Sequence, residues 1–283
     1  MENRINNIVG FLGRLSKKIE IAVHEVKIDN LNEKLNGLTI AQISDLHISE
    51  WNVDLIEHTI EVLNRLKPDI VTMTGDAICN GKKFLPCLTT LFKEIDSTYG
   101  KFACIGNHDH SDGDDSGAIQ SVYKKADFQV LLNSSAYMNI KGEAVYFAGA
   151  DDIELGKQNI YSMTKNIPQD AKSIFLTHNP LNFNQLAKFN PDLVLAGHTH
   201  GGQILPAISK FLYKYLYNSD YISGFYKTEK SLLYVNRGIG TALLSPLILN
   251  KKLIINTPRI YSKPEITLFR LVPNELIESP LIY

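Results

Sequence analysis

Hydrophobic residues along the chain form short apolar runs that alternate with segments of helical periodicity. The apolar runs that predict buried strands occupy 37–44, 69–75, 101–106, 144–150, 173–178, 192–197, 231–236 and 265–271. The segments 53–67 and 83–95 instead repeat their apolar positions every three or four residues, which predicts two helices. Strands that alternate with helices indicate an α/β fold. Because no repeat or low-complexity linker divides these elements, we predict one layered domain over 21–283.

The first twenty residues follow a different pattern. Apolar residues fall at helical spacing, and basic residues lie largely off that stripe; the apolar set is Ile5, Ile8, Val9, Leu12, Leu15 and Ile19, and the basic set is Arg4, Arg14, Lys17 and Lys18. Such a segment fits a helix lying in a membrane interface, and it equally fits a helix packed on the domain. We therefore treat 1–20 as a separate amphipathic segment. No apolar run reaches the roughly 18 to 20 residues that span a bilayer, and no signal peptide is evident.

Composition narrows the classes of protein that the chain can belong to. Its 283 residues are 44% hydrophobic and 21% charged, which suits a globular domain with a sizeable core. The formal net charge is −1, and no long block of Lys or Arg is present, so we expect no nucleic-acid partner. The three cysteines, Cys79, Cys87 and Cys104, do not form a disulfide framework. This usage indicates a reducing compartment, and we expect a cytoplasmic protein.

Polar residues that can bind metal ions follow one predicted strand after another. These residues are Asp45, His47, Asp76, Asn107, His108, His178, His198 and His200. A single aspartate after a strand more often caps a turn or a helix, and a single histidine is more often a hydrogen-bonded core residue. Five such fragments in order, each at the end of a predicted strand, are hard to explain in that way. Because open α/β sheets build their sites at the carboxyl ends of strands, we expect these side chains to converge.

The fragments "DLH", "GD", "GNHD", "H" and "GHTHGGQ" together resemble the calcineurin-like metallophosphoesterase superfamily. The "GHTHGGQ" form, with "NRGIG" and "KPEITLF" near the end of the chain, is most similar to the small bacterial YkuE/YaeI-like branch of that superfamily. The resemblance extends from about Leu38 to Leu271. It implies a four-layer α/β/β/α sandwich with a dinuclear metal site in the domain 21–283.

The resemblance also implies a role for each motif residue. One ion would be held by Asp45, His47 and His200, the other by Asn107, His178 and His198, and Asp76 would bridge both. Oxygen and imidazole ligands without thiolate suit two divalent ions, with Mn²⁺ expected and Fe or Zn²⁺ as alternatives. Two such ions would lower the pKa of bound water toward about 7 and so would supply a hydroxide for in-line attack on phosphorus.

His108 resembles the family's non-ligand histidine, which contacts phosphate and assists the leaving oxygen. In many relatives a carboxylate three residues after the bridging aspartate supports this histidine, and Cys79 occupies that position here. A neutral thiol cannot stabilise an imidazolium as a carboxylate does. This difference favours diphosphates or activated diesters as substrates, unless Asp109 or Asp112 replaces the missing carboxylate.

Two apolar segments follow the "GHTHGG" motif. Ile208, Phe211, Leu212, Tyr215 and Leu216 match one helix face, with Lys210 and Lys214 elsewhere on its surface, and a second apolar segment occupies 242–260. Both fit a lid for a lipid-linked phosphate, and both equally fit a packed accessory helix and an insertion. Arg237 in "NRGIG" is a candidate to bind a substrate phosphate, or it caps local structure. We interpret Asp151 and Asp152 as turn residues.

These observations predict a dinuclear metal-dependent phosphoesterase, cytoplasmic and associated with the inner face of a membrane. The predicted substrate is a lipid-linked diphosphate, as in enzymes that cleave UDP-2,3-diacylglucosamine in lipid A synthesis. One alternative is a generic phosphodiesterase that acts on soluble nucleotides. The other is a metal-free scaffold of the same fold, which the intact set of seven candidate ligands disfavours.

Overall fold

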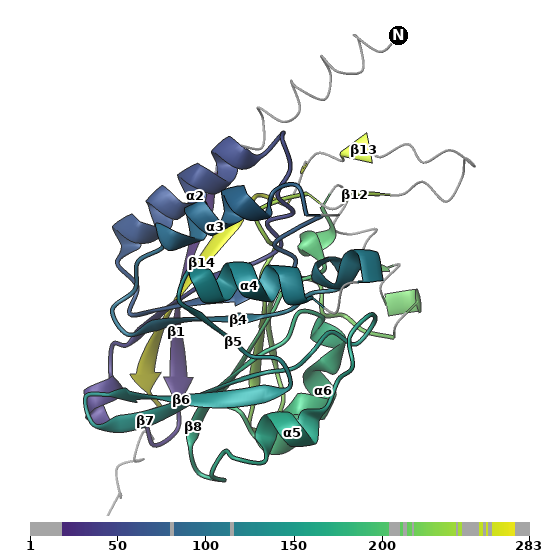
Figure 1. Ribbon diagram of the computed structural model, residues 1–283. Helices are drawn as coiled ribbons and strands as arrows, with labels where there is room; N and C mark the ends of the chain where they lie inside the picture. Colours follow the sequence, from purple (N-terminus) through teal and green to yellow (C-terminus); the bar gives the residue numbers. More distant parts are fainter. Residues whose placement is uncertain are drawn as a thin grey trace, which may run out of the picture.

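The computed structural model describes residues 19–79, 82–113, 116–203, 210–211, 214–216, 218–241, 243–244, 255–256, 259 and 262–274. Within these ranges the chain forms two stacked β-sheets with helices on their outer faces (Figure 1). The amphipathic segment 1–18 and most of the apolar segment 242–260 lie outside the described residues, so the interpretations of both remain predictions. Among the described residues, no helix has both the length and the apolarity that crossing a membrane requires.

The first sheet has six strands in the described part of the chain. Their spatial order is β1 (Glu20–Ile28), β14 (Glu265–Pro273), β2 (Thr39–Ile43), β3 (Ile70–Thr74), β4 (Gly100–Cys104) and β5 (Phe128–Val130). Strands β2 to β5 are parallel, whereas β14 runs antiparallel to β2 and β1 follows the direction of β14. All residues of β3 are buried, as is typical of a parallel strand covered on both faces. Strands β2, β3 and β4 therefore end at the same edge.

The second sheet also has six described strands. Their order is β10 (Gly224–Lys227), β11 (Leu232–Val235), β9 (Leu193–Ala196), β8 (Lys172–Leu176), β7 (Glu143–Gly149) and β6 (Ser134–Ile140). Strands β7, β8, β9 and β11 are parallel, and β6 and β10 pair antiparallel at the two edges. A separate two-stranded ribbon pairs β12 (Leu243–Leu244) with β13 (Ile255–Asn256).

The helices lie on the outer faces of the two sheets. The described α-helices are α2 (Val53–Leu66), α3 (Leu85–Lys93), α4 (Gly117–Lys125), α5 (Ile160–Thr164) and α6 (Phe183–Leu186). Short 3-10 turns are η1 (Glu33–Leu35), η2 (His108–Gly113), η3 (Pro180–Asn182), η4 (Ala187–Phe189) and η5 (His200–Gly202). Helix α2 buries Ile56, Ile60 and Leu63 at helical spacing, and it ends where Lys67 adopts a left-handed conformation.

Three apolar clusters separate the layers. In the first, side chains of α2, α3 and α4 pack on the outer face of the first sheet, among them Ile60, Phe92, Tyr123, Val71 and Met73. The second cluster lies between the sheets, where the rings of Phe102 and Phe147 stack with their centroids 4.0 Å apart. In the third, Met163 of α5 and Phe183 of α6 pack on Phe175 and Val194 of the second sheet. This order of layers, helix–sheet–sheet–helix, confirms the predicted α/β/β/α sandwich.

The predicted elements agree with the structure at the centre of each sheet and miss its edges. All eight apolar runs overlap a strand, and the segments 53–67 and 83–95 contain α2 and α3. The described strands that the sequence pattern did not reveal are β1, β5, β6 and β10, each at the end of its sheet, and β12 and β13, which form the separate two-stranded ribbon. β1 begins at Glu20, inside the segment 1–20 that we had set apart from the domain.

Candidate metal centre

The carboxyl ends of five strands bring the predicted ligands together. Asp45 and His47 follow β2, Asp76 follows β3, and Asn107 follows β4 in the first sheet. From the second sheet, His178 follows β8, and His198 and His200 follow β9. The two halves are joined directly, because the backbone N–H of His198 donates to both carboxylate oxygens of Asp45 at 3.1 Å. Most of these side chains are buried, so the site lies inside the junction of the two sheets.

The backbone at the ligands is conformationally unusual. Five of the seven predicted ligands have a positive φ angle: Asp45 (51°), His47 (43°), Asp76 (54°), His198 (71°) and His200 (51°). Such conformations are uncommon for residues other than glycine, and they cluster at functional sites where the surrounding structure imposes them. Gly197 has no such φ angle, but a Cβ there would collide with Ser44 and the carboxylate of Asp45. Gly197, the first glycine of the "GHTHGG" motif, is therefore needed for close approach of the two sheets.

One group of ligand atoms gathers around His47 and His200. The Nε2 atoms of these two histidines are 3.0 Å apart, with the rings stacked at a centroid distance of 4.9 Å. Asp45 Oδ1 lies 3.4 Å from His200 Nε2 and 3.9 Å from His47 Nε2. The ligand atoms of these three residues lie within 4.8 Å of one another and could hold one ion.

A second group gathers around His178 and His198. His198 Nδ1 lies 3.2 Å from His178 Nε2 and 3.2 Å from Asn107 Oδ1. Asp76 Oδ2 lies between the groups, 3.1 Å from His178 Nε2 and 3.5 Å from His47 Nε2. The structure therefore brings all seven predicted ligands together and places the Asp76 carboxylate where it can face both groups.

Burial shifts the pKa values of several of these groups toward the uncharged form. It raises the pKa of Asp45 to about 6 and lowers the pKa values of His47 and His198 to about 3. Burial, followed by the charge of Arg259, holds the pKa of His200 well below its usual value. His178 differs: burial opposes protonation, but the Asp76 carboxylate raises its pKa well above the ordinary range. Burial likewise opposes ionisation of Asp76, yet His178 holds its pKa well below normal.

The residues at this site fit divalent cations. His178 Nδ1 donates to the carbonyl oxygen of Thr74 at 2.8 Å. Its Nε2, which faces Asp76 and His198, is therefore the nitrogen that carries the extra proton in the absence of a cation and that offers a lone pair to a bound one. Lone pairs of imidazoles and carboxylates converging at 3.0–3.5 Å repel each other unless a cation or a proton lies between them. The donors are oxygen and nitrogen without thiolate, a set that suits Mn²⁺, Fe or Zn²⁺.

His108 lies beside the ligand cluster and is held by a backbone group. Its ring packs edge-on against His47 at a centroid distance of 4.8 Å, and its Nδ1 lies 2.9 Å from the carbonyl oxygen of Cys79. The Cys79 thiol points elsewhere, with Sγ 3.5 Å from the carbonyl oxygen of His47. Burial, with the nearby charge of Asp76, raises the thiol pKa to about 12. The chain therefore supports His108 through the carbonyl group of Cys79, and the thiol takes no part.

Asp109 does not replace the missing carboxylate. Its two oxygens accept backbone N–H groups of Asp76, Ala77 and Gly106 at 2.8–3.0 Å. Asp109 thus holds the turn that presents the bridging aspartate. The side chain of Asp112, the other alternative, lies outside the described residues.

Two arginines lie near the site in different roles. Arg237 donates to Glu265 and, at 2.9 Å, to Glu20, and so ties β14 to β1. These carboxylates occupy its Nε and Nη2 groups, while its role as a phosphate ligand remains a prediction. Arg259, which the sequence interpretation missed, is buried, and its Nη2 donates to His200 Nδ1 at 2.8 Å. Its only sequence context was the apolar segment 242–260, where nothing local distinguishes a buried arginine from a surface one.

Glu154 is a second residue that the sequence did not reveal. Its Oε1 lies 3.6 Å from His198 Nε2 and accepts from Asn179 Nδ2 at 3.1 Å. Burial, with the charge of Asp152, raises its pKa. The loop that carries it is built by Asp152, whose Oδ1 accepts the N–H groups of Glu154 and Leu155 at 2.8 and 2.9 Å. Asp152 therefore acts as a turn residue, as we had interpreted it.

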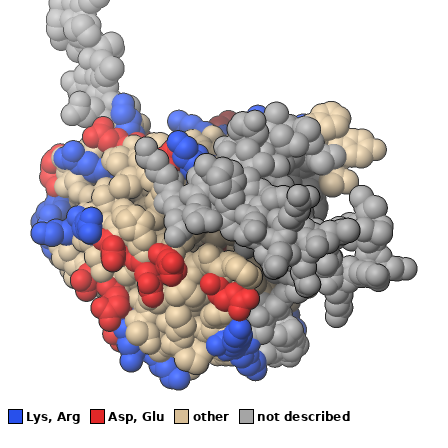
Figure 2. Space-filling model, turned by 90° about the horizontal axis from the view of Figure 1, so that it is seen from above, with Lys and Arg blue, Asp and Glu red and all other residues tan. Residues whose placement is uncertain are grey.

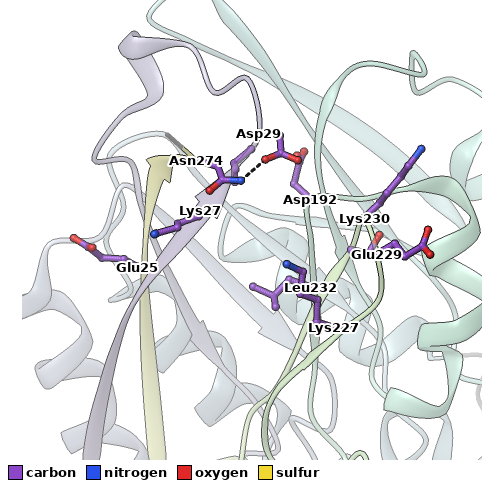
Figure 3. Close-up of a pocket in the computed structure, with 11 residues that line it drawn as sticks. Glu25, Lys27, Asp29, Asp192, Lys227, Glu229, Lys230, Leu232 and Asn274 are labelled. Carbon is purple, nitrogen blue, oxygen red and sulfur yellow. Dashed lines mark hydrogen bonds between the residues drawn. The ribbon is translucent and has the colours of Figure 1, made fainter. Parts of the chain in front are cut away.

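A polar cavity of about 310 Å³ lies away from this site (Figure 3). It opens where β1 and β14 end and β9 and β11 begin, at the edge opposite the predicted ligands. Two of its acidic residues have partners: Asp29 accepts from Asn274 Nδ2 at 2.6 Å, and Asp192 accepts from the N–H of Ser173 at 2.8 Å. The cavity therefore adds no ligand to the metal centre.

The fold and the ligand cluster together define a metal-dependent hydrolase of phosphoesters. The chain belongs to the calcineurin-like phosphoesterase family, whose model matches residues 38–202. It is 31% identical over 258 residues to the uncharacterized metallophosphoesterase YkuE of Bacillus subtilis, which covers 89% of this chain and 85% of the relative. The UDP-2,3-diacylglucosamine pyrophosphatase LpxG of Chlamydia trachomatis is 29% identical over 266 residues, covering 73% of this chain and 79% of the relative. The family is dinuclear and metal dependent, and the chain is a hydrolase.

Proposed function

We propose that the protein hydrolyses a lipid-linked diphosphate with two Mn²⁺ ions held by the seven residues of the candidate metal centre. The observation that carries the reaction class is the convergence of Asp45, His47, Asp76, Asn107, His178, His198 and His200 at one junction of strand ends. Bound ions would supply Lewis acidity and an activated water molecule for attack on phosphorus. The substrate that we favour is UDP-2,3-diacylglucosamine.

Side chains of the protein itself would protonate the leaving oxygen and favour binding of the negatively charged phosphate. A ring nitrogen of His108 lies within 4.8 Å of ligand atoms of His47 and Asp76. Its Nδ1 proton is held by the Cys79 carbonyl group, so Nε2 is available to give a proton to the leaving oxygen. Arg259 adds a buried positive charge next to His200, which favours a phosphate dianion over a neutral ligand. A phosphate leaving group needs less protonation than an alkoxide, which suits a site whose histidine has no carboxylate support.

Apolar side chains beyond the metal motif support a lipid-linked substrate. Phe211, Tyr215 and Leu216 follow the "GHTHGG" turn with 69%, 79% and 66% of their surface exposed. Large apolar groups rarely lie together in water unless they meet a ligand, a partner or a membrane. Lys210 belongs to the same segment. The similarity to LpxG supports the same substrate class, because that protein is named as a UDP-2,3-diacylglucosamine pyrophosphatase. Acidic and basic side chains are both present on the described part of the face in Figure 2.

A substrate comparison tests the proposal. Purified protein is loaded with Mn²⁺ and given UDP-2,3-diacylglucosamine, UDP-glucose or bis(p-nitrophenyl) phosphate. UDP-glucose is the matched control, because it keeps the diphosphate and the uridine but lacks acyl chains. We expect kcat/KM for the lipid to exceed that for UDP-glucose by at least about tenfold, since each buried CH₂ group contributes about 0.8 kcal/mol.

Each other outcome points to a different function. Equal turnover of UDP-glucose and the lipid would favour a phosphodiesterase of soluble nucleotides. No bound metal after purification without chelator, together with no turnover after Mn²⁺ loading, would favour the scaffold. Co-sedimentation with anionic vesicles, compared with a variant lacking residues 1–18, tests the predicted peripheral association with the inner membrane, because basic residues near such a surface contribute about 1 kcal/mol each.

A further inference from the structure

The four histidines of the metal centre differ in what their outward nitrogen contacts. His178 Nδ1 meets the Thr74 carbonyl group, and His200 Nδ1 meets the Arg259 guanidinium group. His47 Nδ1 is buried and has no hydrogen-bond partner among the described residues. His198 alone of the four has a carboxylate next to its outward nitrogen in the described structure, with Glu154 Oε1 3.6 Å from Nε2.

The contacts of His198 Nδ1, the nitrogen that faces the metal centre, determine the protonation of Nε2, the nitrogen that faces outward. Its Nδ1 faces Asn107 Oδ1 and His178 Nε2, each at 3.2 Å, so Nδ1 must keep its lone pair in order to bind a cation there. A neutral imidazole with a lone pair on Nδ1 carries its proton on Nε2. That N–H group then needs an acceptor at the rim, where 20% of the His198 side chain is exposed.

A loop held by several hydrogen bonds brings a carboxylate close to this N–H group, with Glu154 Oε1 3.6 Å from His198 Nε2, just beyond hydrogen-bond distance. Asp152 accepts the N–H groups of Glu154 and Leu155, and Asp151 Oδ2 accepts the N–H group of Lys157 at 2.7 Å. Asp151 is itself fixed by His110, whose Nε2 lies 2.7 Å from its Oδ1. Asn179 Nδ2 donates to Glu154 Oε1 at 3.1 Å, and the same oxygen lies 3.6 Å from His198 Nε2.

We propose that Glu154 is a positioning residue that holds His198 in the tautomer and orientation needed to bind one of the two ions. A carboxylate that accepts the outward N–H of a metal-binding histidine fixes its ring and increases its basicity, and loss of such a partner typically weakens metal binding about 10- to 100-fold. The effect is confined to the ion held by His178, His198 and Asn107. This inference rests on the metal centre of the proposed function.

The test is calorimetric titration of chelator-treated protein with Mn²⁺. Wild-type protein is expected to bind two ions. In Glu154→Ala the affinity for one ion falls about 10- to 100-fold and the affinity for the other is unchanged. Glu154→Gln keeps an acceptor but loses the charge, and its affinity for that ion should lie between those of the wild type and Glu154→Ala. Leu155→Ala, a change at a neighbouring side chain that is 61% exposed on the same loop, binds both ions as the wild type does.

A double-mutant comparison separates this role from a general effect on the loop. His198→Ala weakens the same ion, and Glu154→Ala adds nothing further in that background, because the carboxylate acts through the ring. The inference is overturned if Glu154→Ala binds both ions with wild-type affinity, if it weakens both ions equally, or if its effect persists in His198→Ala. Failure of the wild-type protein to bind any Mn²⁺ would instead overturn the proposed function.

Discussion

His108 Nδ1 lies 2.9 Å from the carbonyl oxygen of Cys79, and the thiol of the same cysteine faces away from the ring. The sequence placed Cys79 where relatives carry a carboxylate, and it suggested that a thiol had replaced a charged partner. The structure shows a different arrangement, in which the backbone carbonyl of residue 79 accepts a hydrogen bond from the histidine N–H whatever side chain is present there. A carbonyl group orients the ring but stabilises its positive charge less than a carboxylate does.

This contact predicts that the side chain of residue 79 matters little for turnover. Cys79→Ser keeps the carbonyl group, and we expect its kcat on bis(p-nitrophenyl) phosphate to stay within a factor of about 3, because less than about 0.7 kcal/mol is at stake. His108→Ala should lower kcat about 10²- to 10⁴-fold, the usual contribution of general acid catalysis. Steady-state kinetics of both variants decide the matter. A loss in Cys79→Ser as large as that in His108→Ala would show that the thiol itself is required.

Removal of the bridging carboxylate is expected to empty the centre. Asp76 Oδ2 lies 3.1 Å from His178 Nε2 and 3.5 Å from His47 Nε2, so Asp76→Ala takes a ligand from both groups of atoms. We expect fewer than one ion per chain and a loss of nearly all turnover, measured by mass spectrometry of bound metal and by kinetics. Asp96→Ala, at an exposed position, is the control. Two tightly bound ions in Asp76→Ala would refute the assignment.

The central strands of each sheet can be predicted from the sequence more easily than the edge strands. Buried parallel strands such as β3 carry continuous apolar runs, because both of their faces are covered. β1 alternates exposed and more buried residues and includes charged Glu25 and Lys27, so its pattern is that of a half-solvated segment. The same difference explains why edge strands β6 and β10 were missed.

The candidate ligands could be found because each follows a strand that the apolar pattern reveals. Asp76 follows β3, and His198 follows β9, so spacing along the chain carries spatial information. Glu154 and Arg259 lie in loops, where distance along the sequence says nothing about which side chain turns toward the site. Only the folded structure shows that Glu154 meets His198 and that Arg259 meets His200.

The lack of space around Gly197 prevents any larger residue from occupying this position of the motif without a shift of its neighbours. A Cβ atom at this position would overlap Ser44 and the Asp45 carboxylate, and both are backed by buried structure that cannot shift cheaply. Gly197→Ala should therefore displace Asp45 and lower the affinity for the ion that His47 and His200 bind, at a stability cost of about 1–3 kcal/mol. Manganese titration and urea unfolding measure the two effects. Unchanged metal affinity in a folded variant would contradict the close approach.

The ion pair of His110 and Asp151 predicts a pH dependence of stability. The hydrogen bond to Asp151 raises the pKa of His110; burial opposes ionisation of Asp151, but the same bond lowers its pKa. A raised histidine pKa stabilises the fold fully below the unfolded value of 6.5, and this stability is lost as pH rises through the folded pKa. A lowered aspartate pKa stabilises above 3.8, and this stability is lost as pH falls through the folded pKa.

The pair therefore contributes most between about pH 4 and 6.5. His110→Ala should cost about 1.5–3 kcal/mol at pH 5.5, as expected for a hydrogen bond between charged groups, and less at pH 9. Urea unfolding of chelator-treated wild type and variant across this range gives the difference directly. His58→Ala removes an exposed contact with Glu61 at 3.5 Å and should change stability by less than about 1 kcal/mol at every pH. A cost for His110→Ala that does not vary with pH would contradict the charged pair.

The exposed aromatic residue Phe211 provides the last prediction, which concerns the substrate. Its side chain is 69% exposed, so Phe211→Asp removes little core packing and should change stability by less than about 0.5 kcal/mol. If the segment contacts acyl chains, the charge is placed against hydrocarbon, and kcat/KM for UDP-2,3-diacylglucosamine falls while that for UDP-glucose is unchanged. Tyr161→Asp, on α5 with 75% exposure, is the matched control and should leave both substrates unaffected. An equal fall for both substrates would place Phe211 in the diphosphate site, and no fall for either would remove the segment from substrate binding.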